Sequence, residues 1–321
     1  MRRKTYRALV IFAVIVVVLA VALAFGVRFH QKTGNDSIST DYQKPDDSIQ
    51  DIEPEPESVK DYPIVPENST FEIHFFDVGE ADSALVECDG HYMLIDGGNP
   101  GSSSFLYSYL QQHNVSYLDY IVCTHAHSDH VGGLAGALNY AEVGVAFSPV
   151  TEYDSRAFNS FIKYLNAQAK EITIPSPGET LELGSATVTF LAPIDMSLAE
   201  TNVNNSSIIL RIVYGKTSFL FTGDAEIEEE LSLLKAGTDI QSTVLKVGHH
   251  GSYTSSSEEF LAAIDPDYAV ISVGMGSEYG HPHDAALERI SKFCPVIYRT
   301  DLNGEVICYS DGLNLIFECG S

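Results

Sequence analysis

Three histidines and an aspartate stand within six residues of this chain, in the run HAHSDH at 125–130. On an extended segment His125 and His127 point the same way, because side-chain direction repeats every two residues. Asp129 and His130 lie on the next turn and can face a second point nearby. Mixed histidine and aspartate ligation suits zinc, and also manganese, iron or nickel. The run predicts a metal site rather than a surface histidine cluster, since an apolar strand precedes it and two glycines follow it.

A site for two metal ions needs further ligands, preferably with a carboxylate between the ions. Asp224 stands at the end of an apolar strand, where it can serve as that carboxylate or cap a helix that begins at Glu226. His249 and His250 follow another apolar strand and lie between two glycines, which let the backbone approach a ligand closely. Both segments are therefore predicted to contribute ligands.

Two more histidines, His281 and His283, stand in a loop that enters a predicted helix. A turn with a helix cap is the alternative interpretation of this segment. Imidazole titrates near neutral pH, so His250, His281 or His283 can hold a substrate oxygen or protonate a leaving group. We expect these histidines to contact the substrate.

The elements that must position these residues are short apolar runs divided by turn signals, from Phe71 onward. Antiparallel hairpins come first, and units in which strand and helix alternate follow. This order predicts an α+β sandwich of two sheets with helices on the outer faces. Strands are expected over 71–78, 82–88, 91–95, 118–123, 143–147, 186–191, 207–213, 217–221, 243–247, 268–272, 296–298, 305–309 and 313–317. Helices are expected over 103–113, 131–140, 154–168, 226–234, 256–264 and 284–293.

Residues 1–68 differ in composition from the part of the chain that follows. Residues 8–27 form an unbroken apolar run of the length that a helix needs to cross a bilayer, and basic residues precede it. We expect residues 1–28 to be a cytoplasmic tip and a single transmembrane anchor, with the rest outside the cytoplasm. A cleaved signal peptide, and hence a secreted protein, is the alternative. Residues 29–68 are acidic and proline-containing, which predicts a disordered tether, and residues 69–321 are predicted to be the catalytic domain.

The chain is strongly acidic, with a formal net charge of −26. Beyond Arg28 there are 13 basic and 44 acidic residues. Duplex DNA binding normally draws on many lysine and arginine contacts to phosphates, so this composition argues against simple duplex binding. The five cysteines include no CxxC pair, which argues against a structural zinc knuckle and against a disulfide-dense scaffold.

The order HxHxDH at 125–130, TGD at 222–224 and HHGS at 249–252, on strands that alternate with helices, resembles the metallo-β-lactamase superfamily. More narrowly, the chain resembles the soluble hydrolase module of the ComEC competence proteins over roughly residues 71–319. The supporting runs are DVGEADS at 77–83, LIDGG at 94–98, NNSS at 204–207, KVGHHGS at 246–252 and YGHPH at 279–283.

This resemblance implies the αββα sandwich and a site for two divalent ions, zinc by preference and manganese as the alternative. The implied ligands are His125 and His127 on one ion, Asp129, His130 and His249 on the other, with His250 as the alternative to His249, and Asp224 as the bridge. Asp129 or Asp224 would orient a water activated by the ions. The residues expected to be catalytic are Asp129, Asp224, His250 and His283. Those expected to bind substrate are Asn205, Ser206, His250, His281 and His283.

Two departures from the family pattern bear on function. Many members carry another metal-binding histidine where this chain has residues 204–207, which leaves the first ion a ligand short. ComEC proteins carry a channel domain of many spans, whereas this chain has a single apolar run, so it is not expected to be a DNA channel. The expected activity is that of a phosphodiesterase or nuclease, with single-stranded DNA as a candidate substrate.

Two alternatives remain at this stage. One is a hydrolase of a cell-surface ester, such as a teichoic-acid phosphodiester, a lactone or a β-lactam. The other is a non-catalytic, metal-dependent binding module. The membrane is a predicted partner through the N-terminal helix, and no protein partner is inferred.

Overall fold

A computed structural model of the chain describes residues 62–320. The predicted membrane anchor (1–28) and most of the predicted tether (29–68) lie outside these residues. Among the helices of the described segment, none is both long and apolar enough to cross a membrane. The predicted catalytic domain is described up to residue 320, and its first strand begins at Phe71.

The first sheet has eight strands, and it changes from antiparallel to parallel pairing across its width. In spatial order they are β15 (Leu315–Cys319), β14 (Val306–Ser310), β1 (Phe71–Phe75), β2 (Ala84–Cys88), β3 (His91–Ile95), β4 (Tyr117–Val122), β5 (Glu142–Phe147) and β6 (Ile172–Thr173). Strands β1, β2 and β3 pair antiparallel, and a two-residue turn joins β2 to β3. Strands β3 to β6 run parallel because helical segments connect them.

The second sheet has seven strands and shows the same change of pairing. In spatial order they are β13 (Val296–Arg299), β12 (Tyr268–Ile271), β11 (Val244–Lys246), β10 (Thr217–Phe221), β9 (Ile209–Tyr214), β8 (Ala186–Ala192) and β7 (Thr180–Leu183). Strands β7 to β10 pair antiparallel, and β10 to β13 run parallel. Each sheet therefore has a parallel half, whose strands end in loops at a common edge.

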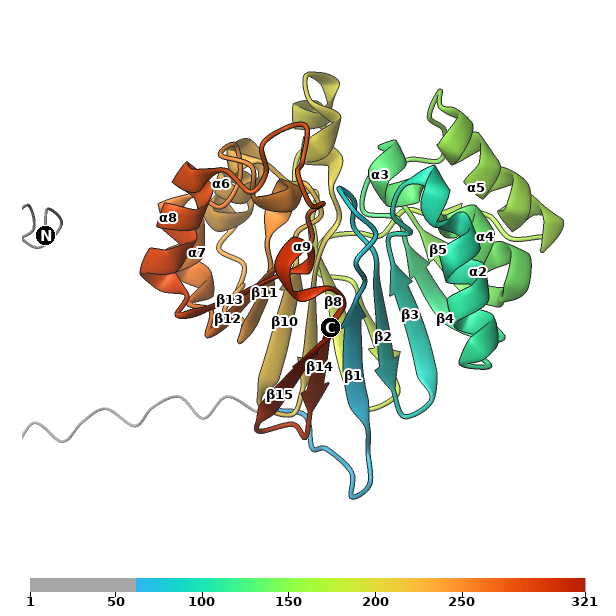
Figure 1. Cartoon of the computed structure of the whole chain (residues 1–321), viewed down its shortest axis with the longest axis horizontal. Helices are drawn as coiled ribbons and strands as arrows, with labels where there is room; N and C mark the ends of the chain where they lie inside the picture. The colour runs from blue at the N-terminus through green and yellow to red at the C-terminus, as the bar shows by residue number, and fades with distance from the viewer. Residues whose placement is uncertain (1–61, 321) are drawn as a thin grey trace, which may run out of the picture. The chain divides into compact units, whose positions relative to one another are not determined.

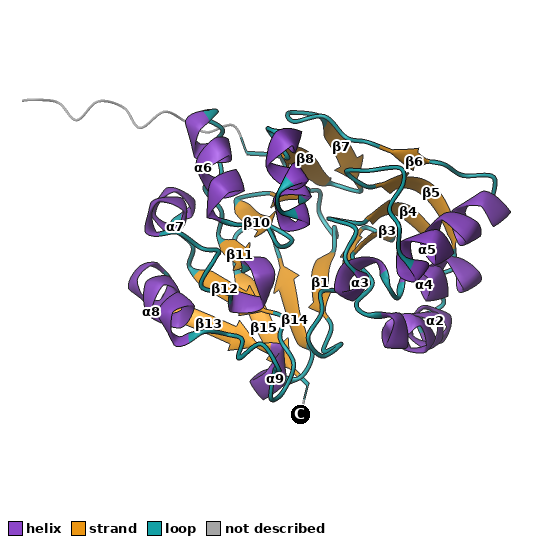
Figure 2. Ribbon diagram, turned by 90° about the horizontal axis from the view of Figure 1, so that it is seen from above, coloured by secondary structure: helices purple, strands orange, loops and turns teal. Residues whose placement is uncertain are grey.

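Helices cover the outer face of each sheet, which confirms the predicted two-sheet architecture (Figure 2). Beside the first sheet lie α2 (Ser103–Gln112), α4 (Leu134–Tyr140) and α5 (Arg156–Ala167). Beside the second lie α6 (Ile227–Lys235), α7 (Glu258–Ile264) and α8 (Asp284–Phe293). Short helices are α3 (Ser128–Val131), α9 (Thr300–Asn303), and the 3-10 turns η1 (Pro100–Ser102), η2 (Met196–Glu200), η3 (Val203–Ser206) and η4 (Gly248–Gly251).

Three apolar layers hold this sandwich together. Between the two sheets, the ring of Phe71 stacks on Tyr214 and Phe219, and Phe75 stacks on Phe221. A second apolar layer joins the first sheet to α2, α4 and α5, and a third joins the second sheet to α6, α7 and α8. Each fully buried aromatic or aliphatic side chain contributes roughly 1.5–3 kcal/mol. The strand ends are thus anchored on both faces, which makes them a rigid base for a site.

One predicted helix is divided in the structure. The sequence predicted a single helix over 131–140, whereas α3 begins at Ser128 and α4 begins at Leu134. Gly132 and Gly133 separate the two helices, and a Cβ on Gly133 would clash with the carbonyl of Gly97. The close approach of another loop therefore interrupts the helix, and this contact is not visible in local periodicity. The short strands β6 and β7 were also missed, because each has few apolar residues.

Candidate metal centre

The predicted ligands come together where three strands end. His125 and His127 follow β4, with His127 at the N-terminus of α3, and Asp224 follows β10. His249 and His250 lie in η4, directly after β11. Strand β4 belongs to one sheet and β10 and β11 to the other, so the site lies between the sheets at one end, beside α3 (Figure 1). Strands buried on both faces hold side chains more rigidly than free loops do.

A tight turn sets the direction of Asp224. Gly223 has a φ of +51°, and a Cβ there would lie 2.9 Å from the side chain of Thr124. Glycine is the residue that adopts this conformation without steric strain. The backbone N–H of Asp224 donates to Oγ of Ser207 at 3.0 Å. The turn therefore brings the second sheet against the segment that carries His125.

Four residues form the tightest group of ligand atoms. One atom each from Asp129, His130, Asp224 and His250 lie within 4.8 Å of one another. Nε2 of His130 is 3.2 Å from Oδ1 of Asp224, and Nε2 of His250 is 3.7 Å from Oδ2 of Asp224. Oδ2 of Asp129 is 3.4 Å from Nε2 of His250. Two imidazole nitrogens and two carboxylates facing one point form a donor set that suits a divalent transition metal.

Three atoms of this group are buried without a hydrogen-bond partner in the described structure: Nε2 of His130, Nε2 of His250 and Oδ1 of Asp224. Leaving one buried polar atom unpaired costs about 1–3 kcal/mol. Three such atoms at one point are unusual in a folded chain, because their free-energy costs add. A cation bound among them would satisfy all three, so the residues present fit a metal ion.

His125 and His127 form a second histidine pair near Asp224. Nε2 of His125 lies 3.1 Å from Nδ1 of His127 and 3.9 Å from Oδ2 of Asp224. His125 is fully buried, whereas His127 lines an open cleft. The carboxylate of Asp224 therefore lies close to both groups, with Oδ1 3.2 Å from Nε2 of His130, and Oδ2 3.7 Å from Nε2 of His250 and 3.9 Å from Nε2 of His125.

The two adjacent histidines of η4 point in different directions. Both adopt a left-handed backbone conformation, with φ of 48° at His249 and 52° at His250. His249 contacts Glu226 through Nδ1 at 3.2 Å, and its Nε2 is 3.9 Å from Oδ2 of Asp224. His250 is buried and belongs to the tight four-residue group. The geometry thus favours His250 as the ligand, whereas the sequence interpretation preferred His249.

Asp96 positions His130, a role that the sequence analysis did not assign. Its Oδ2 accepts from Nδ1 of His130 at 2.8 Å, which leaves Nε2 facing the site. Asp96 also accepts from the backbone N–H and the hydroxyl of Thr124, both at 2.7 Å. A buried carboxylate on the far nitrogen of a histidine orients the ring and raises its basicity as a ligand. In the sequence, the feature that could have indicated this role is a carboxylate directly after the apolar run 91–95.

A buried ion pair plays the equivalent part for His250. Nδ1 of His250 is 3.3 Å from Oδ1 of Asp82 and 3.0 Å from the carbonyl of Ser272. The ammonium of Lys246 donates to Oδ2 of Asp82 at 2.7 Å and to the carbonyl of Val247 at 2.9 Å. Asp82 and Lys246 are both nearly inaccessible to solvent. Their charges therefore compensate each other and fix the carboxylate that faces His250.

The carboxylates around the histidines control the charge of the site. Burial lowers the pKa of His250, but the carboxylates of Asp224 and Asp129 outweigh this and raise that pKa to about 10. For Asp224, burial raises the pKa, but the nearby imidazoles hold it well below the usual value for aspartate. The cluster therefore favours positive charge at this point, whether protons or a divalent cation carry it.

A cleft of about 370 Å³ opens over the cluster. Its described lining contains carboxylates, imidazoles, a hydroxyl, an amide and a phenol, but no lysine or arginine. The lining residues are Glu80, His127, Ser128, Asp129, Asn204, Asp224, His249, His250, Tyr279 and His281. An anionic substrate in this cleft would meet positive charge mainly from bound cations and from imidazoles.

Three residues predicted to contact the substrate do not line this cleft. Asn205 is buried, and its Oδ1 accepts from the backbone N–H of Glu226 at 3.0 Å. The buried hydroxyl of Ser206 donates to the carbonyl of Val203. His283 accepts from the backbone N–H of Tyr253 through Nδ1 at 3.1 Å. Asn204, which the sequence analysis did not single out as a site residue, lines the cleft instead.

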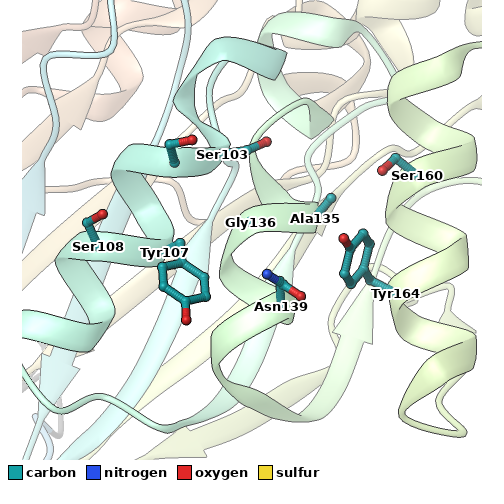
Figure 3. Close-up of a pocket in the computed structure, with 9 residues that line it drawn as sticks. Ser103, Tyr107, Ser108, Ala135, Gly136, Asn139, Ser160 and Tyr164 are labelled. Atoms are coloured by element: carbon teal, nitrogen blue, oxygen red, sulfur yellow. The ribbon is translucent and has the colours of Figure 1, made fainter.

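A larger hollow lies away from the histidines, between α2, α4 and α5 (Figure 3). Its volume is about 460 Å³. Serines, two tyrosines and an asparagine line it, with no charged or histidine side chain among the described lining residues. Tyr107, Asn139 and Tyr164 come from three different helices (Figure 3). This groove has room for a ligand but lacks the acid, base or metal-binding groups of the cleft.

Comparison with known proteins agrees with this geometry. The family model of the metallo-beta-lactamase superfamily matches residues 76–274. The metallo-beta-lactamase fold protein YhfI from Bacillus subtilis superimposes with a TM-score of 0.51 at 12% identity, over 75% of this chain and all of that one. At that identity the likeness concerns the fold alone.

Curated relatives are similar over about three quarters of the sequence. ComE operon protein 3 of Bacillus subtilis is 28% identical over 76% of this chain and 33% of its own length. Competence protein ComA of Neisseria gonorrhoeae is 32% identical over 75% of this chain and 32% of its own. Recombination protein 2 of Haemophilus influenzae is 29% identical over 74% of this chain and 28% of its own length. The chain thus spans about a third of the length of the curated relatives that it matches.

Proposed function

The chain belongs to the metallo-beta-lactamase superfamily of metal-dependent hydrolases, and on that premise we propose that it is a phosphodiesterase with two divalent metal ions that acts outside the cytoplasm. One observation carries the metal part of the proposal. Nε2 of His130, Nε2 of His250 and Oδ1 of Asp224 are buried, unpaired and directed at one point. A single cation bound at that point would satisfy all three at once.

The residues have separate roles in this proposal. His125 and His127 would hold one ion, while Asp129, His130 and His250 would hold the other. Asp224 would be shared by both ions, because its carboxylate lies within 3.2 Å of His130 and within 3.9 Å of His125. Bound divalent ions would supply Lewis-acid charge and a water of lowered pKa. Residues 204–207 stand where many family members carry another metal ligand, so the ion at His125 and His127 is expected to bind more weakly.

A phosphodiester is the substrate class that fits the cleft best. A phosphodiester carries one negative charge, which two bound ions can meet in a cleft whose described lining has no lysine or arginine. Two of the relatives are named for competence and for recombination, which favours a nucleic acid as the source of that diester. The acidic chain opposes duplex binding, so we propose a single strand that reaches the cleft from one end.

The location outside the cytoplasm rests on sequence alone. The apolar run 8–27, preceded by basic residues, is the basis for proposing a single-pass anchor with a cytoplasmic N-terminus. Fusion of a reporter that is active only outside the cytoplasm to the C-terminus would test it. Activity of the same reporter only when fused to the N-terminus would overturn the proposed orientation.

The activity is tested with the full-length chain, supplied with zinc or manganese, on bis-p-nitrophenyl phosphate and on a single-stranded oligonucleotide. We expect both to be cleaved, and cleavage to be lost in the His127→Ala, Asp129→Ala double variant. The matched control is His91→Ala, Asp119→Ala, which also removes one histidine and one aspartate, here a pair in contact at 3.0 Å outside the cleft. Cleavage of the small diester without the oligonucleotide would favour a cell-surface ester. No turnover with two ions bound per chain would favour a lactone, another carboxylic ester, or a binding role.

A further inference from the structure

A tyrosine ring stands open to solvent at the cleft. Tyr279 is 73% exposed, and it lines the cleft over the metal cluster. Its ring lies nearly parallel to the imidazole of His281, with the ring centroids 5.7 Å apart and an angle of 23° between the planes. Most of the surface of this aromatic side chain is therefore not used in packing the fold.

Ring contacts continue from Tyr279 along one line. The ring centroid of His281 lies 4.8 Å from that of His283, which lies 4.9 Å from that of Tyr253. Tyr253 is also exposed, at 58%. The ring of His281 is 5.5 Å from that of His249, beside the candidate metal centre. Four rings, here called the aromatic strip, thus lead from the cleft to the surface outside it: Tyr279, His281, His283 and Tyr253.

A carboxylate holds the cleft end of the aromatic strip in place. Oε2 of Glu80 accepts from the backbone N–H of Gly274 at 3.1 Å, and Oε1 of Glu80 is 2.7 Å from Nδ1 of His281. Within the same loop, Oγ of Ser277 accepts from the backbone N–H groups of Tyr279 and His281, both at 3.3 Å. The ring of Tyr279 is therefore carried by a fixed loop, so a ligand that stacks on it pays little ordering entropy.

The outer end of the strip is anchored on α8. Nη2 of Arg289 donates to the carbonyls of Tyr253 at 2.9 Å and Ser255 at 2.7 Å, and its Nε donates to the carbonyl of Ser256 at 3.0 Å. The backbone N–H of Tyr253 donates to Nδ1 of His283 at 3.1 Å. Both exposed tyrosines are thus presented by backbone that other residues hold.

The charge of the chain restricts how it can hold a single strand. Proteins usually bind nucleic acid through many lysine and arginine contacts to phosphates. This chain has 18 basic and 44 acidic residues, and the described lining of the cleft has no lysine or arginine. Bound metal ions would meet the charge of the reacting phosphate but not that of its neighbours. The rest of a bound strand therefore needs an interaction that does not depend on charge.

Stacking of nucleobases on aromatic side chains is such an interaction. We propose that the aromatic strip is a platform on which unpaired nucleobases beside the reacting phosphodiester stack, with one base on Tyr279 and a later one on Tyr253. The inference deepens the proposed phosphodiesterase function and rests on its single-stranded substrate. Every base has a flat face, so the platform accepts any sequence. In a duplex the bases are paired and stacked on one another, so a duplex cannot use the platform without being opened.

The first experiment gives the metal-loaded full-length chain two single strands of about ten nucleotides, a length that one stacking groove can cover. One is oligothymidylate, and the other has the same phosphates but an abasic tetrahydrofuran sugar at every position. Tyr279→Ala should raise KM for oligothymidylate about 5–150-fold relative to KM for the abasic strand, because one base loses its stacking partner. Tyr279→Phe should keep this ratio within about threefold of that of the unaltered protein, because the ring remains.

Tyr117→Ala is the matched control. Tyr117 is 49% exposed, but it is the first residue of β4, whereas the cleft lies beyond the last residue of that strand. This variant should leave the ratio of the two KM values within about twofold. Tyr253→Ala should change the ratio in the same direction as Tyr279→Ala.

The second experiment detects stacking without cleavage. The metal-loaded full-length chain is mixed with a short 5-iodouracil strand whose methylphosphonate linkages are uncharged and resist hydrolysis. Near-ultraviolet light breaks the carbon–iodine bond and joins the uracil to an aromatic ring that it stacks on. Peptide mapping should find the uracil on Tyr279 or Tyr253.

The outcomes separate the platform from the activity. An unchanged KM ratio in Tyr279→Ala, or cross-links found only outside the aromatic strip, would overturn the inference even if both strands are cleaved. Loss of binding to phosphatidylglycerol vesicles in Tyr279→Ala, with an unchanged KM ratio, would overturn it in favour of a membrane surface. Cross-links on the strip in a protein that cleaves neither strand would support the platform and contradict the proposed phosphodiesterase activity.

Discussion

Two buried histidines, His74 and His130, make similar contacts with carboxylates but differ in what remains unpaired. Nδ1 of His74 lies 2.9 Å from Glu305, and its Nε2 lies 3.1 Å from Glu72. Nδ1 of His130 lies 2.8 Å from Asp96, whereas its Nε2 is buried without a hydrogen-bond partner among the described residues. Both rings are oriented by a carboxylate, but only the second has a nitrogen directed at other unpaired atoms.

This difference shows how a histidine that stabilises the fold can be distinguished from a metal ligand. His74 lies on β1 and links it to Glu305, just before β14, and to α2 through the hydroxyl of Tyr109 at 3.0 Å. All its hydrogen-bonding capacity is used within the protein, so it stabilises the fold. His130 is satisfied on one side only, and the free side faces Asp224. A carboxylate contact alone therefore does not identify a ligand, whereas convergent unpaired atoms do.

The comparison predicts its largest effect for His130→Ala. Removing this nitrogen should reduce the bound metal and lower kcat/KM by roughly 10³-fold or more, since bound metal supplies several kcal/mol of transition-state stabilisation. His74→Ala should leave the metal content unchanged. Metal analysis and kinetics on both variants would measure this. A His130→Ala protein that retains two ions and full activity would contradict the assignment of the centre.

A smaller effect is expected for Asp96→Asn. The amide cannot stabilise the orientation and basicity of His130 as the carboxylate does, so metal affinity should fall about 10–100-fold. Titration with zinc against a competing chelator would measure the change. Glu305→Gln, which alters the equivalent contact of His74, should leave metal affinity within about twofold. Equal losses in the two variants would show that Asp96 acts on overall stability instead.

His74 should contribute to stability in a pH-dependent way. Burial lowers its pKa, but Glu305 and Glu72 outweigh burial and raise the pKa from 6.5 to about 9. A folded-state pKa above the unfolded value stabilises the protein below about pH 6.5, and this contribution is lost as pH rises through about 9. His74→Ala should therefore lower the free energy of unfolding at pH 6 by roughly 1–3 kcal/mol and much less at pH 10.

Urea denaturation of the chelator-treated protein at both pH values would measure this difference. Chelation matters because metal release would otherwise add its own pH dependence. A cost of His74→Ala that is the same at pH 6 and pH 10 would show that the ring acts through packing and not through its charge.

The smallest effect is expected in the groove between α2, α4 and α5. Asn139→Ala should change the free energy of unfolding by less than about 0.5 kcal/mol, because Asn139 is an exposed side chain of this uncharged groove (Figure 3). It should leave metal binding and the cleavage of bis-p-nitrophenyl phosphate and of the oligonucleotide unaltered. Thermal unfolding and the assays above would test this. A substantial loss of activity would show that the larger hollow, and not the cleft, controls the reaction.

Sequence patterns predicted the strands that carry the site because apolar periodicity and turn residues act locally. The strands 91–95 and 217–221 and the helix 284–293 were predicted with the bounds that the structure has. The division of the helix predicted over 131–140 was not predicted, because it depends on the approach of Gly97 to Gly133. Asn205 and Ser206 were expected to contact the substrate, but the side chain of Asn205 accepts from the backbone N–H of Glu226, and that of Ser206 donates to Val203 within the turn before β9.

By itself the sequence determined the superfamily and the segments that supply the ligands, because ligand types at close spacing are a local property of the chain. Only the tertiary structure decided that His250 faces the cluster while His249 contacts Glu226, since neighbouring residues can be separated only by what surrounds them. It also decided that Asp82 pairs with Lys246, 164 positions away, behind His250. Such partners come from distant segments, and no local pattern records which of them the folded chain brings together.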